Sequence, residues 1–269
     1  MLSFSQRLQN VEASAIRELL KLLGKPGIIS FAGGIPDPAL FDVSGLQAAA
    51  QQALQQWPDV ALQYGVTEGF VPLKEQIAAL AAAKGAPLDE KQILITTGSQ
   101  QALDLVGKCM ISPGDKVIVE APTFLAAIQC FRLYGAHVIN APIDAQGVLP
   151  DRLEQLIVAH KPKFIYLIPT FGNPSGATLT PERRKQVLEL AVWHQVLVIE
   201  DDPYNDLYFD APPPPSLLAL APQVPGSIDW LVHCGSLSKI LSPGLRLGWM
   251  TAPAPLLAQA VMCKQFSDA

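Results

Sequence analysis

A lysine in a small, hydroxyl-rich turn is the side chain of this sequence that is best suited to covalent chemistry. The turn spans residues 235–239, with the sequence GSLSK, and follows an apolar run. If Lys239 is buried, its pKa falls and its amine becomes a nucleophile that forms Schiff bases with carbonyl cofactors. Arg246 can bind a phosphate through two hydrogen bonds, to which Ser236 and Ser238 add hydroxyl donors. An ordinary surface lysine is the alternative interpretation of Lys239 taken alone.

A second anion site is expected where the apolar run at 92–96 ends. Gly98 and Ser99 lie between this expected strand and a helix expected at 100–111. The backbone N–H groups at such a helix N-terminus point out of the helix and bind a single phosphate well. The segment lacks the longer glycine-rich loop of nucleotide-binding proteins, so an ordinary helix cap is an equally good interpretation.

Two further strand ends carry an amide and a pair of carboxylates. Asn173, in the turn FGNPSG, offers an amide donor at the edge of the expected sheet, although Asn-Pro and Ser-Gly are also simple turn residues. Asp201 and Asp202 follow the run at 196–200, where a buried carboxylate needs a partner such as a protonated ring nitrogen. The phenol of Tyr204 could serve the same ligand. A helix-capping aspartate followed by core aromatics is the alternative.

The elements that must position these residues alternate along the chain. Apolar runs typical of strands buried on both faces lie at 92–96, 116–120, 164–168, 196–200, 230–234 and 245–250. Helical patterns lie at 12–23, 44–56, 72–84, 100–111, 123–134, 151–160 and 181–194, and another helix begins near Pro255. This alternation predicts an α/β fold with a largely parallel sheet, in which ligands bind at the carboxyl ends of the strands.

The composition argues against several other classes of protein. The chain has 269 residues, of which 49% are hydrophobic and 16% charged, so it can bury a sizeable core. Its net charge of −5 and the lack of a Lys/Arg block argue against a nucleic-acid surface. The sequence has no apolar stretch long enough to span a membrane, no signal-peptide pattern and no C-x-x-C pair. We therefore expect a cytoplasmic protein with reduced cysteines and without a metal.

Taken in order, these motifs closely resemble those of the class I/II aminotransferases, which are pyridoxal 5′-phosphate (PLP) enzymes of fold type I. The resemblance runs from about residue 12 to the end. It implies the large domain of that fold, a mostly parallel sheet sandwiched by helices. Within the family, the chain is most similar to bacterial 2-aminoadipate and aromatic or multi-substrate aminotransferases, through the segments IRELLKL, SFAGGIPDP, ALQYGVTEG, ITTGSQQALDLVG, EAPTF, YLIPTFGNPSG and EDDPYNDLYF.

The resemblance implies a role toward PLP for each candidate residue. Lys239 would form the aldimine and move a proton between the substrate and the cofactor. Asp201, favoured over Asp202 by the spacing to Tyr204, would pair with the protonated pyridine nitrogen and keep the ring an electron sink. Tyr204 and Asn173 would hydrogen-bond the phenolic oxygen. The remaining cofactor contacts would be Phe124 on the ring face and Gly98, Ser99, Gln100, Ser236, Ser238 and Arg246 around the phosphate.

The resemblance also implies a homodimer and a set of residues that contact the substrate. Tyr64 would reach the phosphate of the neighbouring subunit. Gly33 and Gly34 would let the N-terminal loop approach the substrate, which Asn173 also contacts. Arg17 would lie near the substrate side chain and suit an acidic one, although a surface salt bridge is an equal alternative for this arginine.

The expected reaction moves an amino group from an L-amino acid, such as 2-aminoadipate, glutamate or an aromatic or branched-chain amino acid, to a 2-oxo acid. The same residues also suit a β-lyase or a decarboxylase, and a transcription regulator could use such a core to bind an effector. We expect residues 1–43 to form an N-terminal helix and a substrate-side loop, and residues 44–269 the PLP-binding large domain. The small domain with the carboxylate-binding arginine would follow residue 269, so an inactive fragment is a further alternative.

Overall fold

An eight-stranded sheet forms the centre of the described chain, in the order β1-β8-β7-β6-β5-β2-β3-β4. The computed structural model describes residues 2, 5–8 and 33–268. Strands β3, β2, β5, β6 and β7 run parallel, while β8 lies antiparallel between β7 and β1, and β4 lies antiparallel to β3. The strands are β1 (Ile93–Thr96), β2 (Lys116–Ala121), β3 (His137–Asp144), β4 (Gly147–Val148), β5 (Phe164–Leu167), β6 (Leu197–Asp201), β7 (Leu231–Ser236) and β8 (Gly248–Thr251).

All six strands predicted from the sequence are present, and the mostly parallel α/β sheet is confirmed. The prediction missed β3 and β4. Most residues of β3 are partly or fully exposed, and Asn140 and Pro142 interrupt its apolar pattern, as is typical of a strand near a sheet edge. The last strand was predicted to begin at 245, but a 3₁₀ turn occupies Pro243–Leu245, so that β8 begins only at Gly248.

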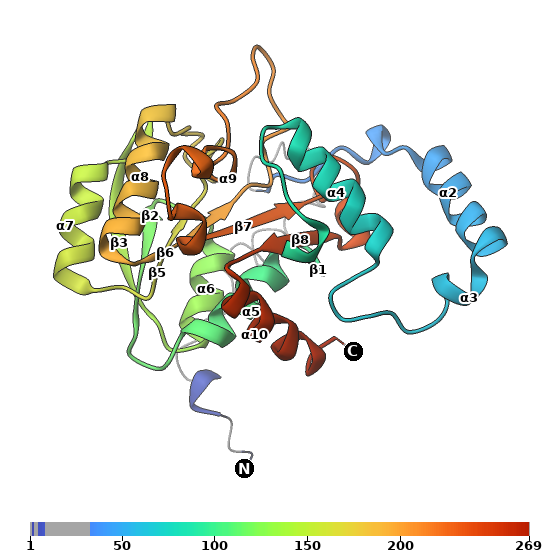
Figure 1. Ribbon diagram of the computed structural model, residues 1–269, viewed down its shortest axis with the longest axis horizontal. Helices are drawn as coiled ribbons and strands as arrows, with labels where there is room; N and C mark the ends of the chain where they lie inside the picture. The colour runs from blue at the N-terminus through green and yellow to red at the C-terminus, as the bar shows by residue number, and fades with distance from the viewer. Residues whose placement is uncertain (1, 3–4, 9–32, 269) are drawn as a thin grey trace, which may run out of the picture.

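Helices cover both faces of the sheet (Figure 1). Side chains of β5 alternate between the two faces, so that Phe164 and Tyr166 join one buried cluster while Ile165 and Leu167 join the other. Helices α5 (Ser99–Met110), α6 (Leu125–Leu133) and α10 (Ala254–Gln265) pack on the first face. Helices α7 (Pro150–His160), α8 (Pro181–His194) and α9 (Leu217–Leu220) pack on the second. The predicted helices in this part of the chain are thus confirmed.

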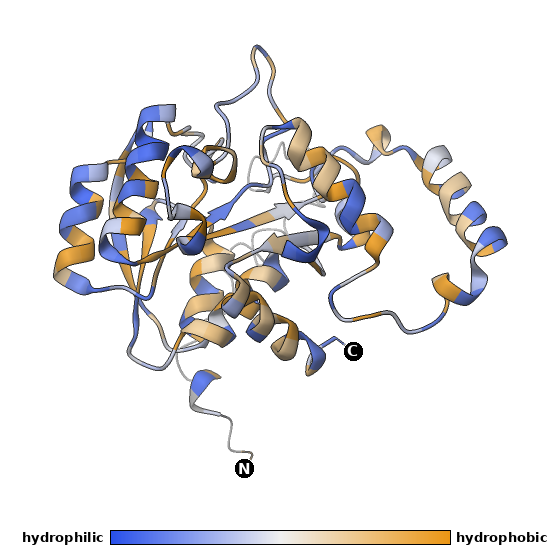
Figure 2. Ribbon diagram, viewed as in Figure 1, coloured by the Kyte–Doolittle hydropathy of each residue, from blue (hydrophilic) through white to orange (hydrophobic). Residues whose placement is uncertain are grey.

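The helices of the second face bury only one side. In α8 the buried residues are Arg184, Val187, Leu188 and Ala191, which recur with the helical period. Figure 2 shows both polar and apolar bands along α7 and α8. Each fully buried leucine or valine contributes about 1.5–3 kcal/mol to stability. The polar exception in this stripe is Arg184, which therefore requires a separate explanation.

An exposed arm, formed by α2, α3 and the segment up to α4, extends from this body and carries several exposed apolar side chains. Helices α2 (Val43–Gln56) and α3 (Pro58–Ala61) lie apart from the sheet in Figure 1, and α4 (Val71–Ala83) returns the chain to β1. Neither α2 nor α3 buries a side chain against the described residues, and Trp57, Val60 and Leu62 are 56%, 55% and 76% exposed. So much exposed apolar surface is typical of a face that binds another protein surface.

Some predicted features lie partly or wholly outside the described residues. The helix expected at 12–23 and Arg17 lie outside the described residues. The substrate-side loop expected within residues 1–43 is described from residue 33 and contains a 3₁₀ turn at Pro38–Leu40. The proline-rich segment 211–216 runs over the surface before α9. No helix within the described ranges combines the length and the apolar character that crossing a membrane requires.

Candidate active site

The polar turns predicted from the sequence leave neighbouring strands at one edge of the sheet. Strand register pairs Asp201 of β6 with Cys234 of β7, and Ser236 of β7 with Gly248 of β8. Gly248 is also paired with Thr96, the last residue of β1. The carboxyl ends of β1, β6 and β7 and the start of β8 therefore lie side by side. The sheet brings the turns that follow Thr96, Asp201 and Ser236 to one place.

The start of α5 and Arg246 form one part of this site. Gly98 precedes α5 with a φ of 74°, and a Cβ built on it would lie 2.5 Å from Nη2 of Arg246. A Cβ on Gly248 would lie 2.8 Å from the backbone nitrogen of Ser99. Arg246 Nη2 donates a hydrogen bond to the Thr97 carbonyl at 3.2 Å. Both glycines are required for this close approach, which sets the guanidinium beside the positive end of the α5 dipole.

The Lys239 turn borders this anion site. Ser236 is buried at the end of β7, and its Oγ accepts a hydrogen bond from the backbone N–H of Ser238 at 3.1 Å. Lys239 is half-buried, and its Nζ donates to the Gly34 carbonyl at 2.6 Å. Burial lowers the pKa of the Lys239 amine. The N-terminal loop therefore reaches the lysine, and the amine has the shifted pKa that a nucleophile needs.

Asp201 combines deep burial with an unused acceptor. It is 2% exposed, and its Oδ2 accepts a hydrogen bond from the Tyr166 hydroxyl at 2.7 Å. Its Oδ1 is also buried and has no hydrogen-bond partner among the described residues. Burial raises the pKa of Asp201 to about 6, against the opposing effect of the Tyr166 hydroxyl. A donor or a cation on Oδ1 would remove this penalty.

Sequence reasoning missed Tyr166. It lies in the middle of the apolar run FIYLI, and it is completely buried in β5. A buried tyrosine hydroxyl needs a hydrogen-bond partner, and this requirement was the signal in the sequence. Burial and Asp201 together raise the pKa of Tyr166, so its hydroxyl stays protonated and donates to the carboxylate.

Asn173 and Tyr204 meet beside Asp201. The Asn173 side-chain amide donates to the Tyr204 hydroxyl at 3.2 Å, although 31 residues separate them. Burial raises the pKa of Tyr204, and the Asn173 amide opposes the shift. The loops that follow β5 and β6 thus bring together the amide and the phenol that the sequence singled out. Their polar atoms are free to contact a third group because both side chains are only partly buried.

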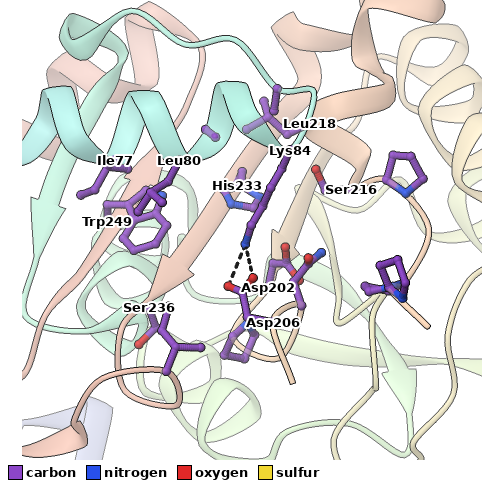
Figure 3. A pocket seen from close by; sticks show the side chains of 18 of the residues that line it. Ile77, Leu80, Lys84, Asp202, Asp206, Ser216, Leu218, His233, Ser236 and Trp249 are labelled. Atoms are coloured by element: carbon purple, nitrogen blue, oxygen red, sulfur yellow. Dashed lines mark hydrogen bonds and ion pairs between the residues drawn. The ribbon is translucent and has the colours of Figure 1, made fainter. Parts of the chain in front are cut away.

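Asp202 faces a different space from Asp201. Asp202 and His233 line a cavity of about 520 Å³, to which α4 and the segment before α9 also contribute. Figure 3 shows side chains that line it. Lys84 reaches from α4 to Asp206, with Nζ 2.6 Å from Oδ1. Successive residues of a strand point to opposite faces, so Asp202 lies on the Glu200 side, away from Tyr166. This geometry favours Asp201 over Asp202 for the ring nitrogen.

The other predicted residues take varied positions. Phe124 immediately precedes α6 and packs against the core of the first face, and Gln100 lies in the first turn of α5. Gly33 is exposed in the N-terminal loop. Tyr64 is 87% exposed in the segment between α3 and α4, outside the group of side chains around Asp201.

The residues present fit PLP. Asp201 Oδ1 is an unpaired buried acceptor for a protonated ring nitrogen, within the described part of the chain. No side chain of the described residues caps the N-terminus of α5, so its first N–H groups remain available to a phosphate next to Arg246. Lys239 offers an amine with a lowered pKa. Each functional group of the cofactor therefore has a matching group in the protein.

Comparison with known proteins agrees with this arrangement. The model of the family "Aminotransferase class I and II" matches residues 35–267. A 2-aminoadipate transaminase of Thermus thermophilus is 42% identical over 268 residues, which cover 99% of this chain and 65% of the relative. An aromatic-amino-acid aminotransferase of Thermococcus litoralis is 39% identical, with 98% of this chain and 64% of the relative covered. The chain thus spans slightly less than two thirds of the length of these relatives.

A solved structure shows the same fold. It is an α-aminoadipate aminotransferase from Thermus thermophilus in complex with N-(5′-phosphopyridoxyl)-L-leucine, and it superposes with a TM-score of 0.88 at 42% identity. The match covers 98% of this chain and 65% of that structure. The family model, the relatives and the fold lead to one conclusion: the chain belongs to the class I and II aminotransferases, whose cofactor is PLP.

Proposed function

We propose that this protein transfers the amino group of an L-amino acid to a 2-oxo acid with PLP as its cofactor. The observation that carries the proposal is Asp201 Oδ1, a buried acceptor without a donor in the described ranges, on the side of β6 that faces Tyr166. Asp202 Oδ1 is also buried without a donor there, but it lies on the opposite side, in the cavity with His233. A protonated ring nitrogen would supply both the donor and a compensating charge. The names of the relatives support 2-aminoadipate and aromatic amino acids as donors, with glutamate and branched-chain amino acids as further candidates.

Lys239 is proposed to hold the cofactor covalently and to move a proton at the substrate α carbon. Its lowered pKa leaves more of the amine neutral and able to accept that proton. When bound, PLP supplies the electron sink for the negative charge at this carbon. Asp201 keeps the ring nitrogen protonated, and Tyr204 and Asn173 orient the phenolic oxygen. The proposed remaining cofactor contacts are Phe124 at the ring face and Gly98, Ser99, Gln100, Ser236, Ser238 and Arg246 at the phosphate.

The exposed arm supports a homodimer as the working form. Tyr64 and Leu62 are 87% and 76% exposed and follow the uncovered helices α2 and α3. We propose that this arm packs on a second copy and that Tyr64 reaches the partner's phosphate site. Residues 44–269 would form the cofactor-binding large domain. Gly33 and Gly34 would border the substrate, which the hydrogen bond from Lys239 to Gly34 supports.

The visible spectrum of the purified protein with PLP tests the proposal. Lysine-bound PLP absorbs in the visible range, and this band should change to that of the aminated cofactor when 2-aminoadipate or glutamate is added. A 2-oxo acid should then restore it. Lys239→Ala should abolish the original band because it removes the amine that is proposed to bind the cofactor.

Lys163→Ala provides the matched control. Lys163 immediately precedes β5, so it lies at the amino end of this strand, whereas the candidate site lies at the carboxyl ends. Its Nζ lies 3.7 Å from Asp115 Oδ2. Its loss should leave the band unchanged. Release of ammonia or carbon dioxide without amino transfer would reject the aminotransferase reaction in favour of a lyase or a decarboxylase. An unchanged band in Lys239→Ala would reject the lysine assignment.

A further inference from the structure

A completely buried arginine holds both ends of the loop that carries Asn173. Arg184 lies in the first turn of α8 and has no exposed surface. Its Nε donates to the Leu179 carbonyl at 3.0 Å. Its Nη2 donates to the Pro169 carbonyl at 2.8 Å and to Thr170 Oγ1 at 2.9 Å. These acceptors come from the first two residues and the last residue of the segment 169–179, and Asn173 lies between them.

Burial makes this arginine costly. Removal from water lowers the pKa of the Arg184 guanidinium, and the negative charge of Glu200 opposes this decrease. Arg184 Nη1 lies 3.9 Å from Glu200 Oε1, and both side chains are inaccessible to solvent. Replacing buried ion pairs by apolar residues is often neutral or stabilising, so stability alone is a weak reason for a buried arginine. Its rigid fork of donors instead fixes acceptors on two sides of one loop.

Glu200 anchors this arginine to the strand that carries Asp201. Glu200 accepts hydrogen bonds from the backbone N–H groups of Leu217 at 2.7 Å and Leu218 at 3.1 Å. His233 Nδ1 lies 3.0 Å from Glu200 Oε2. The network therefore joins α8 to β6, β7 and α9 on the face opposite Asp201. A shift of α8 would be transmitted through Arg184 to the Asn173 loop.

We propose that Arg184 is a positioning residue for the aminotransferase reaction. It fixes the 169–179 loop so that the Asn173 amide stays within reach of Tyr204 and of the phenolic oxygen of PLP. The inference rests on the proposed function. The present distance from Asn173 Nδ2 to the Tyr204 hydroxyl is 3.2 Å, near the upper end for a hydrogen bond, so a loop movement of less than about 1 Å would break it.

The variant Arg184→Lys tests this role because it keeps the charge and loses the fork. Without PLP, hydrogen–deuterium exchange of the peptide 169–179 should be faster than in the wild type. With PLP, the pH at which the visible band of the bound cofactor changes should rise, because the phenolic oxygen loses a donor. The kcat should fall about tenfold, the effect of roughly one hydrogen bond, with little change in KM.

Arg183→Lys provides the control from the same helix turn. Arg183 binds Asp144 through Nη1 at 2.6 Å and Nη2 at 2.7 Å, and Nη1 also donates to the Gly147 carbonyl at 3.1 Å. These side-chain partners belong to β3 and β4 and not to the 169–179 loop. This variant should leave the exchange of the loop and the pH response of the band unchanged. If Arg184→Lys fails to fold, Thr170→Val replaces it, because it removes one acceptor of Arg184 and keeps the buried ion pair. Its effects should have the same direction and be smaller.

A double-variant cycle identifies the residue through which Arg184 acts. In the Asn173→Ala background, Arg184→Lys should cause no further fall in kcat and no further shift of the band. If the two substitutions instead lower kcat by the product of their single effects, and the wild type transfers amino groups, the inference about Arg184 is wrong while the proposed function stands. Unchanged exchange of the loop in both Arg184→Lys and Thr170→Val would also overturn it. A wild-type protein that binds PLP but does not transfer amino groups would overturn the proposed function and the reaction role of Arg184 together.

Discussion

Glu200 and Asp201 are neighbouring carboxylates at the end of β6, and both are buried, with exposures of 0% and 2%. Their pKa values nevertheless move in opposite directions. Burial raises the pKa of Asp201 to about 6, because the Tyr166 hydroxyl compensates only part of the cost. Burial also acts to raise the pKa of Glu200, but His233, Arg184 and the Leu217 N–H outweigh it, so that its pKa is lowered.

The difference separates a structural face of the sheet from a binding face. Both oxygens of Glu200 have donors, so this carboxylate links fixed parts of the fold. Asp201 retains a buried oxygen without a donor in the described part of the chain. The rise in the pKa of Asp201 from 3.8 to about 6 corresponds to on the order of 3 kcal/mol. This energy becomes available when a cationic ligand pairs with Asp201.

The largest expected effect is that of Asp201→Asn on catalysis. Asparagine keeps the shape but cannot hold a proton on the ring nitrogen through charge. We expect the rate of the half-reaction with an amino donor to fall roughly 10²–10³-fold, as for loss of one preorganised electrostatic group. Stopped-flow absorbance with 2-aminoadipate would measure this rate. A decrease of only a few-fold would show that Asp201 does not carry the electronic role.

Glu200→Gln should instead act on stability. The substitution leaves the buried Arg184 without its counter-ion and changes the partner of His233. We expect a loss of about 3–5 kcal/mol in the free energy of unfolding. Denaturation by urea would measure it.

Glu120→Gln provides the matched control for a buried glutamate. Glu120 is 5% exposed and accepts one hydrogen bond, from the Ile168 N–H at 2.8 Å. Burial raises its pKa to about 7, so a neutral amide is a closer replacement for this side chain. Glu120→Gln should therefore lower the free energy of unfolding much less than Glu200→Gln does. Equal losses would indicate that Glu200 contributes no more than a generic buried carboxyl.

The sequence predicted the binding face better than the structural face. Asp201 directly follows an apolar run, and Asn173 and Lys239 lie in the short turns after two others, so their positions at strand ends could be inferred from the strand pattern alone. Arg184 lies in a helix that was predicted at 181–194, but its side chain was assigned no role. Its acceptors lie 5 to 15 residues earlier in a loop. Such contacts depend on how α8 packs, which local periodicity does not specify.

The pairing of Tyr166 with Asp201 could not be predicted for a related reason. The two residues are 35 positions apart and meet because β5 and β6 are neighbours in the sheet. The sequence shows that both strands exist, but it does not give their order. The strand β3 was missed because its exposed residues dilute the apolar pattern that identified the others.

The pH dependence of stability offers a smaller, quantitative test of the Asp201 penalty. The folded protein without PLP holds a proton on Asp201 more tightly than the unfolded chain, whose carboxyl has a pKa near 3.8. The free energy of unfolding should therefore fall as the pH rises from 3.8 to about 6, by on the order of 3 kcal/mol from this group.

The difference between wild type and Asp201→Asn isolates this contribution, because the other titrating groups are common to both. Urea denaturation at several pH values would measure it, and the two curves should diverge between 3.8 and about 6. Parallel curves would contradict the raised pKa. In the wild type, PLP should remove the loss, since the ion pair with the ring nitrogen favours the charged carboxylate.

The smallest effect on catalysis is expected for Asp202→Asn. Asp202 is the next residue after Asp201, but it lines the cavity beside His233 and Lys84 instead of facing Tyr166. Burial and the nearby Glu200 raise its pKa to about 6, so a neutral amide suits the position. We expect the rate of the half-reaction to change less than about threefold, below the effect of one neutral hydrogen bond. A rate loss equal to that of Asp201→Asn would show that the two faces of the strand end are not functionally separate, because the carboxylate of the structural face would then also control the cofactor.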